Sequence, residues 1–72
     1  YRAYLTAQKD YEKYLRLENQ KKAAKGLNKM IRLNPYDLDL IKKRMALDNK
    51  RNREKYEEYD TKLLQFLEAL SR

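Results

Sequence analysis

The feature that most constrains the fold of this 72-residue chain is Asn34-Pro35, near its midpoint, with a long helical pattern on each side. Asn favours helix N-cap positions, and Pro favours the first helical position because its φ angle is already helical. Asp37 and Asp39 follow where negative charge meets the positive end of a helix dipole. The sequence therefore predicts an all-α fold, an antiparallel, coiled-coil-like helical hairpin. Its expected elements are a helix over about 2–32, a turn over about 33–36 and a helix over about 36–70.

Both predicted helices carry two apolar zones separated by a polar stretch, when the residues are placed at about 100° each. Folding the chain about Asn34-Pro35 sets these apolar zones against each other. It also sets the polar stretch around Asn19 opposite the one around Asn49. Asparagine at core positions commonly fixes the register of paired helices, and the alternative is a polar stretch that is exposed or bound by a partner.

Gly26 leaves the continuity of the first helix open. As a helix C′ residue it would mark a break near 25–27, and as an interior residue it would allow a second helix to approach closely. The apolar face also rotates between Tyr11 and Ala24, which fits either a supercoiled helix or two helices.

A chain of this size buries little core, so we expect one module that either self-associates into a four-helix arrangement or belongs to a larger protein. The first residue, Tyr1, is not Met, which favours an excised or processed segment. Tyrosines and large apolar residues are the candidates for the seam between the arms or between copies. This seam set comprises Tyr4, Tyr11, Tyr14, Tyr56, Tyr59, Leu63, Phe66 and Leu67.

Positive charge is concentrated in the half of the chain nearest the turn. Residues 21–55 hold twelve Lys and Arg against four Asp and Glu, a net charge of +8, whereas the whole chain carries +7. Such a surface attracts a polyanion or an acidic protein. The predicted electrostatic binding residues are Lys21, Lys22, Lys25, Lys29, Arg32, Lys42, Lys43 and Arg44. The acidic residues Glu54, Glu57, Glu58 and Asp60 alternate with Lys55 and Lys62 and are expected to form ordinary surface pairs.

The composition argues against an enzyme. The chain has no His or Cys, and its one Ser and two Thr have no base beside them. A single Gly excludes a glycine-rich phosphate loop. From these features together we expect no catalytic residue, cofactor or metal. The lack of Cys suits an intracellular, cytoplasmic setting, and the interrupted apolar face makes membrane contact an unfavoured alternative.

Three stretches carry a resemblance to a known family: Ala23-Ala24-Lys25-Gly26-Leu27, then Asn34-Pro35, and a long second helix from Leu38 to Leu67-Glu68-Ala69-Leu70. Together they resemble the Rho-binding antiparallel coiled-coil finger, the homology-region-one repeat of protein-kinase-C-related kinases and certain F-BAR adaptors. The resemblance spans about residues 12–70. It implies binding of a GTP-loaded Rho-family GTPase along the arms.

Two functions from different classes compete at this point. The leading hypothesis is a non-catalytic protein-interaction or assembly module that binds an acidic protein partner, a small GTPase or a second copy of itself. The alternative is nucleic-acid binding, RNA in particular, through the basic half of the chain near the turn. Stacking of bases on the tyrosines is disfavoured, because most tyrosines lie in the half with little net charge.

Overall fold

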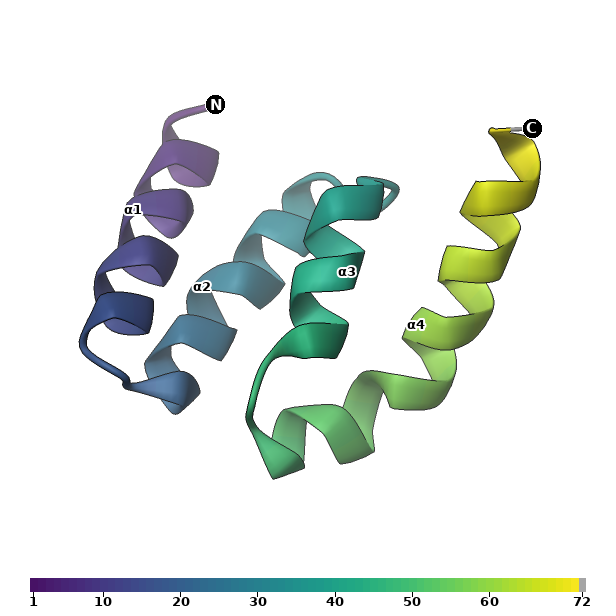
Figure 1. Ribbon diagram of the computed structural model, residues 1–72. Helices are drawn as coiled ribbons and strands as arrows, with labels where there is room; N and C mark the ends of the chain where they lie inside the picture. The colour runs from purple at the N-terminus through teal and green to yellow at the C-terminus, as the bar shows by residue number, and fades with distance from the viewer. Residues whose placement is uncertain (72) are drawn as a thin grey trace.

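The computed structural model describes residues 1–71, and all of its regular secondary structure in that range is helical. The four helices are α1 (Arg2–Arg16), α2 (Gln20–Leu33), α3 (Leu38–Ala46) and α4 (Lys50–Leu70). They run alternately down and up in a row, and both chain termini lie at the same end of the molecule (Figure 1). The predicted all-α class is confirmed.

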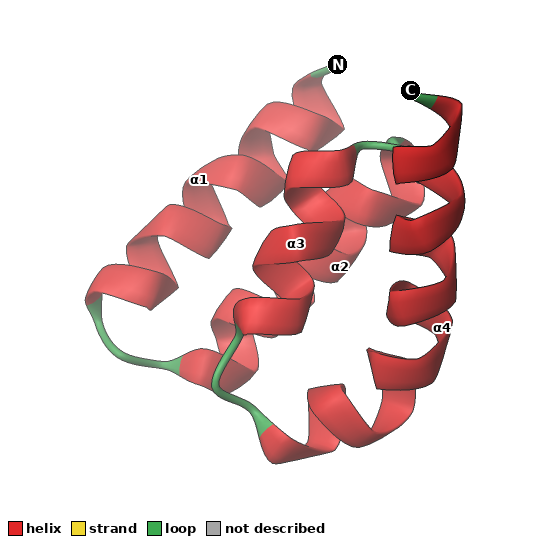
Figure 2. Ribbon diagram, turned by 45° about the vertical axis from the view of Figure 1, so that its right-hand side comes forward, coloured by secondary structure: helices red, strands yellow, loops and turns green. Residues whose placement is uncertain are grey.

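The prediction of two long arms is wrong in detail, because each arm is divided into two helices. The first arm breaks at residues 17–19 and the second at residues 47–49. Both breaks lie at the end of the molecule opposite the turn between α2 and α3 (Figure 2). These positions are the polar stretches of the sequence, which therefore form loops rather than the middle of continuous helices.

The first break is built as a helix C-cap on a residue other than glycine. Glu18 has a φ of 56°, in the left-handed region. Its N–H donates to the Leu15 carbonyl at 3.1 Å, and the Asn19 N–H donates to the Tyr14 carbonyl at 2.8 Å. These two bonds form the Schellman motif that closes many helices. The break suggested near Gly26 does not occur, since α2 runs through that residue.

The central turn lies close to where the sequence placed it, but its capping residue differs. Asp37, not Asn34, is the N-cap of α3, and its Oδ1 accepts from the backbone N–H of Asp39 at 3.0 Å and of Leu40 at 3.3 Å. Asn34 ends α2 and donates from Nδ2 to Asp37 Oδ2 at 3.2 Å. Pro35 lies within this turn, before the first helical residue, Leu38.

The asparagines of the polar stretches act as helix caps. Asn19 Oδ1 accepts from the Lys22 N–H at 3.2 Å, and Asn49 Oδ1 accepts from the Asn52 N–H at 3.1 Å. Each cap satisfies one of the free N–H groups at the start of α2 or α4. The register-fixing role predicted for Asn19 and Asn49 is therefore replaced by a capping role.

The apolar core lies where α1, α2 and α3 meet. Leu27 and Ile41 are fully buried in it, and Ala7 and Tyr11 bring α1 onto α2. A Cβ atom on Gly26 would lie 2.9 Å from the Tyr11 backbone nitrogen and 3.0 Å from the Ala7 carbonyl oxygen. The interior reading of Gly26, as a residue that permits close helix approach, is the correct one.

α4 takes a different place from the one the hairpin predicted. α1 packs mainly on α2, and α4 packs mainly on α3. Leu63 and Leu64 contact the edge of the core, whereas Tyr59, Phe66 and Leu70 are 60%, 58% and 68% exposed. The tyrosines of α1 are thus used inside the α1–α2 pair, and the outer half of α4 keeps an uncovered apolar face.

Candidate functional site

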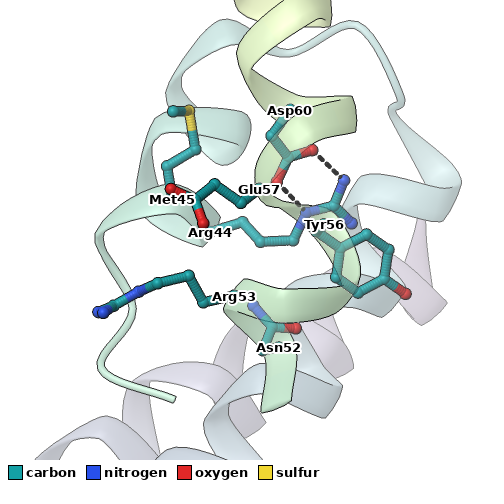
Figure 3. A pocket seen from close by; sticks show the side chains of 7 residues that line it. All are labelled: Arg44, Met45, Asn52, Arg53, Tyr56, Glu57 and Asp60. Carbon is teal, nitrogen blue, oxygen red and sulfur yellow. Dashed lines mark hydrogen bonds and ion pairs between the residues drawn. The ribbon is translucent and has the colours of Figure 1, made fainter. Parts of the chain in front are cut away.

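A buried ion pair joins α3 to α4. The Arg44 guanidinium donates from Nε to Asp60 Oδ2 at 2.8 Å and from Nη2 to Asp60 Oδ1 at 2.5 Å. Arg44 is 5% exposed and Asp60 is 1% exposed. Figure 3 shows the two side chains meeting in this bidentate geometry. Such a pair is strongly directional, and removing one partner leaves an uncompensated buried charge.

Two asparagines extend this pair into a network that reaches α2. Arg44 Nη1 donates to Asn28 Oδ1 at 3.3 Å, and Asn28 Nδ2 donates to Asn52 Oδ1 at 3.2 Å. A guanidinium can only donate, so it fixes the orientation of the Asn28 amide, which in turn fixes that of Asn52. Asn52, 7% exposed, is left with its Nδ2 making no hydrogen bond within residues 1–71.

Tyr56 closes one side of the network. Its ring centre lies 3.9 Å from Arg44 Cζ, a cation–π contact that covers one face of the guanidinium. The network lines a cavity of about 280 Å³, with Met45, Arg53 and Glu57 at its sides (Figure 3). The charge of Arg44 is satisfied by Asp60, so the network has a structural role and holds α4 in place. We call the network of Arg44, Asp60, Asn28 and Asn52 the polar joint.

A second hollow carries unpaired positive charge. It is a groove of about 490 Å³ between the beginnings of α2 and α4, lined by Lys21 and Lys25 from α2 and by Arg51 and Lys55 from α4. We call this the basic groove. Asn49, Asn52 and Tyr56 also line it, and no carboxylate does so among the residues that the structure describes.

The two helix ends add to the positive potential of the basic groove. α2 and α4 both begin at the same end of the molecule (Figure 1), and the first turn of neither helix contains an acidic residue. Helix N-termini carry partial positive charge and free N–H groups. The groove is therefore a region where an anion meets cations from two helices.

The eight predicted electrostatic residues do not form one surface. Lys21 and Lys25 line the basic groove, whereas Lys22 and Lys29, together with Lys25, border a second hollow beside Tyr14 on the side of α1. Arg32, Lys42 and Lys43 are exposed elsewhere on α2 and α3. Arg44 is buried, so its charge does not face solvent, contrary to the prediction.

The predicted seam is also divided. Tyr4, Tyr11 and Tyr14 lie on α1 at the core, and burial raises the pKa of the Tyr11 hydroxyl, with Glu12 adding to the effect. On α4, Tyr56 is part of the polar network, and Leu67 is half-buried. The remaining seam residues lie on one side of α4. With Leu70 they form what we call the α4 stripe: Tyr59, Leu63, Phe66 and Leu70.

Sequence reasoning missed Asp60 and Asn28 of the buried network, and Arg51 and Lys55 of the basic groove. Asp60 was grouped with surface pairs, and that expectation holds only for Glu58 and Lys62, whose exposed charges lie 3.1 Å apart. A signal was available, because Asp60 falls on the same helix face as Tyr56 and Leu63. Arg44 likewise follows Leu40 and Ile41 at helical spacing. Opposite charges on two facing apolar stripes predict a buried pair.

Two other features are absent from the part of the chain that the structure describes. Among residues 1–71 there is no group of three or more side chains that could hold a metal ion, and no helix in that range is long and apolar enough to cross a membrane. Comparison with protein-family models, curated proteins and solved structures finds no match for this chain.

Proposed function

We propose that this chain is a non-catalytic helical module that associates with a second copy of itself through the α4 stripe. The observation that supports the proposal is the exposure of Tyr59, Phe66 and Leu70 along one line of α4, on which the half-buried Leu63 also reaches the edge of the core. Contiguous exposed apolar residues of this kind mark interaction surfaces.

The spacing of the stripe suits helix-on-helix packing. Tyr59, Leu63, Phe66 and Leu70 alternate in steps of four, three and four residues. This is the a/d pattern of a coiled-coil seam, and all four residues fall within about 60° around the helix axis. A second helix is therefore the partner whose shape covers the α4 stripe most completely.

The stripe is also self-complementary. Two copies of α4 packed antiparallel about the point midway between Leu63 and Phe66 set each Leu63 against the other copy's Phe66, and Tyr59 against Leu70. A surface that meets its own copy in this way gives a two-fold dimer.

Sedimentation equilibrium of the wild-type chain and of Phe66→Ser tests the proposal. We expect the wild type to form a dimer and Phe66→Ser to shift the equilibrium towards monomer at least tenfold, because a large apolar contact is lost. The matched control is Leu17→Ser, which removes a residue that is 64% exposed in the loop between α1 and α2.

A wild-type chain that remains monomeric at high concentration would contradict the proposal, and so would equal effects of Phe66→Ser and Leu17→Ser. Binding of a GTP-loaded Rho-family GTPase, which the sequence resemblance implies, stays a prediction. Adding such a GTPase in its GTP and GDP states to the same sedimentation experiment tests it.

A further inference from the structure

We propose that the basic groove binds the sugar–phosphate backbone of a single-stranded nucleic acid. The groove is separate from the α4 stripe, so this inference does not depend on self-association. Within the basic half of the sequence, this proposal assigns binding to four cations on facing helices: Lys21, Lys25, Arg51 and Lys55.

Charge is the first argument. The four cations line one concave surface without an acidic residue among its described lining residues. None of the four forms an ion pair with another described side chain. Lys21 and Lys25 are one helical turn apart on α2, as Arg51 and Lys55 are on α4. Two parallel rows of positive charge match a chain of phosphates better than a single anion.

An unsatisfied hydrogen-bond donor is the second argument. Asn52 forms part of the groove wall, and the network described above leaves its Nδ2 without an acceptor within residues 1–71. A buried donor left unpaired costs free energy until an acceptor reaches it. Phosphate oxygens are strong acceptors, and the Asn52 side chain would turn towards the groove to donate to one, because its Nδ2 is buried in the structure.

The wall of the groove favours a single strand over a duplex. Tyr56 is half-buried there, with Arg44 on its ring and Lys55 Nζ at 5.3 Å from the ring centre. Single-strand sites combine a positive groove with aromatic side chains against which bases lie. A duplex keeps its bases stacked inside and would use only the cations. The sequence disfavours base stacking for all the tyrosines, Tyr56 included, whereas the structure places Tyr56 beside four cations.

Fluorescence anisotropy with a labelled oligouridylate of about 12 nucleotides, a length within the range of known single-strand sites, tests the proposal. We expect saturable binding at low salt that weakens as salt rises, with a log–log slope of about 0.7 for each phosphate neutralised. The double variant Lys25→Gln/Lys55→Gln should lower that slope by about 1.4 and weaken binding at least tenfold.

The matched control is Lys29→Gln/Lys42→Gln, which removes the same net charge from exposed positions outside the groove. It should retain the wild-type slope and most of the affinity. Phe66→Ser should bind the oligonucleotide as the wild type does, which separates this inference from the proposed dimer.

Three results would overturn the proposal. One is no saturable binding at low salt, and another is an equal loss of affinity in the groove variant and its control, which would show attraction by net charge alone. The third is displacement of the oligonucleotide by a duplex, or by polyglutamate at the same charge concentration, as readily as by unlabelled oligouridylate. Polyglutamate competition would make an acidic protein the partner instead.

Discussion

The two helix pairs of this small protein are held together by different physics. α1 meets α2 through small and apolar residues, with Gly26 against the backbone of α1 at Ala7 and Tyr11. α4 meets α3 and α2 through the buried network of Arg44, Asp60 and the two asparagines. The contact between α1 and α2 is apolar and close, whereas the contact of α4 with α3 and α2 is polar and directional.

The comparison shows how a short chain can order a long helix without covering its apolar face. A buried ion pair fixes the position of α4 at Asp60, so the apolar residues that follow in α4 do not have to pack on the core to hold the helix. Phe66 and Leu70 remain exposed as a result. The polar joint thus accounts for the stripe that we propose as the association surface.

The largest expected effect comes from breaking the polar joint. Asp60→Ala should destabilise the protein by about 3–5 kcal/mol, because it leaves the Arg44 guanidinium buried without its partner. For a chain of this size that is a large part of a total stability of about 4–11 kcal/mol. Urea unfolding followed by circular dichroism measures the loss.

Replacing both partners at once sharpens this prediction. Arg44→Met/Asp60→Leu should recover most of the stability, since buried ion pairs can be exchanged for apolar residues of similar volume at little cost. Lys62→Ala, which removes the exposed partner of Glu58, serves as the control and should change stability by less than about 1 kcal/mol. If Asp60→Ala unfolds at the same urea concentration as the wild type, the polar joint is not needed for stability.

Disturbing the apolar contact between α1 and α2 should give the next largest loss of stability. Gly26→Ala adds a Cβ 2.9–3.2 Å from backbone atoms of Tyr11 and Ala7, which cannot rotate away as a side chain could. Overpacking costs about 1–3 kcal/mol, and the better helix propensity of Ala returns about 1 kcal/mol, so we expect a net loss of up to about 2 kcal/mol.

The same urea titration measures the Gly26→Ala effect, with Lys29→Ala on the exposed face of α2 as the control. An unchanged or raised stability in Gly26→Ala would mean that α1 lies farther from α2 than the structure places it.

A smaller change should stabilise the protein. Glu18→Gly places glycine at the left-handed C′ position of α1, where a side chain is strained at a φ of 56°. We expect a gain of about 1 kcal/mol from relief of this strain. Glu12→Gly, inside α1, should instead lose about 1 kcal/mol, and thermal unfolding of the two variants separates the effects.

The smallest effect should appear at high pH. The pKa of Tyr11 is raised by burial, so the unfolded chain ionises this hydroxyl at a lower pH than the folded protein does. Stability from Tyr11 is therefore fully present below about pH 10 and falls as the pH rises above that value. Urea titrations of the wild type and Tyr11→Phe across this range should show a shallower loss in the variant.

Local sequence rules predicted the helical class and the central turn, because helix propensity and turn residues act over a few positions. They failed at the helix ends. The C-cap of α1 uses Glu18, a residue that rarely adopts positive φ, whereas the one glycine serves helix contact. The sequence leaves Gly26 open between a helix break and a close helix contact, and tertiary packing decides for the contact.

The candidate sites were predicted in part for a similar reason. Lys21 and Lys25 were recognised by their charge, but their partners Arg51 and Lys55 become neighbours only after the second arm breaks at residues 47–49. Arg44 was misassigned because charge alone does not reveal burial. Its place beside Asp60 depends on how α4 crosses α3.

Native-state hydrogen exchange of the full chain at two protein concentrations tests the central claim, that the α4 stripe is the association surface. We predict that amides of residues 59–70 gain protection as the concentration rises, while those of α2 stay unchanged. Protection that is independent of concentration along the whole of α4 would contradict the claim.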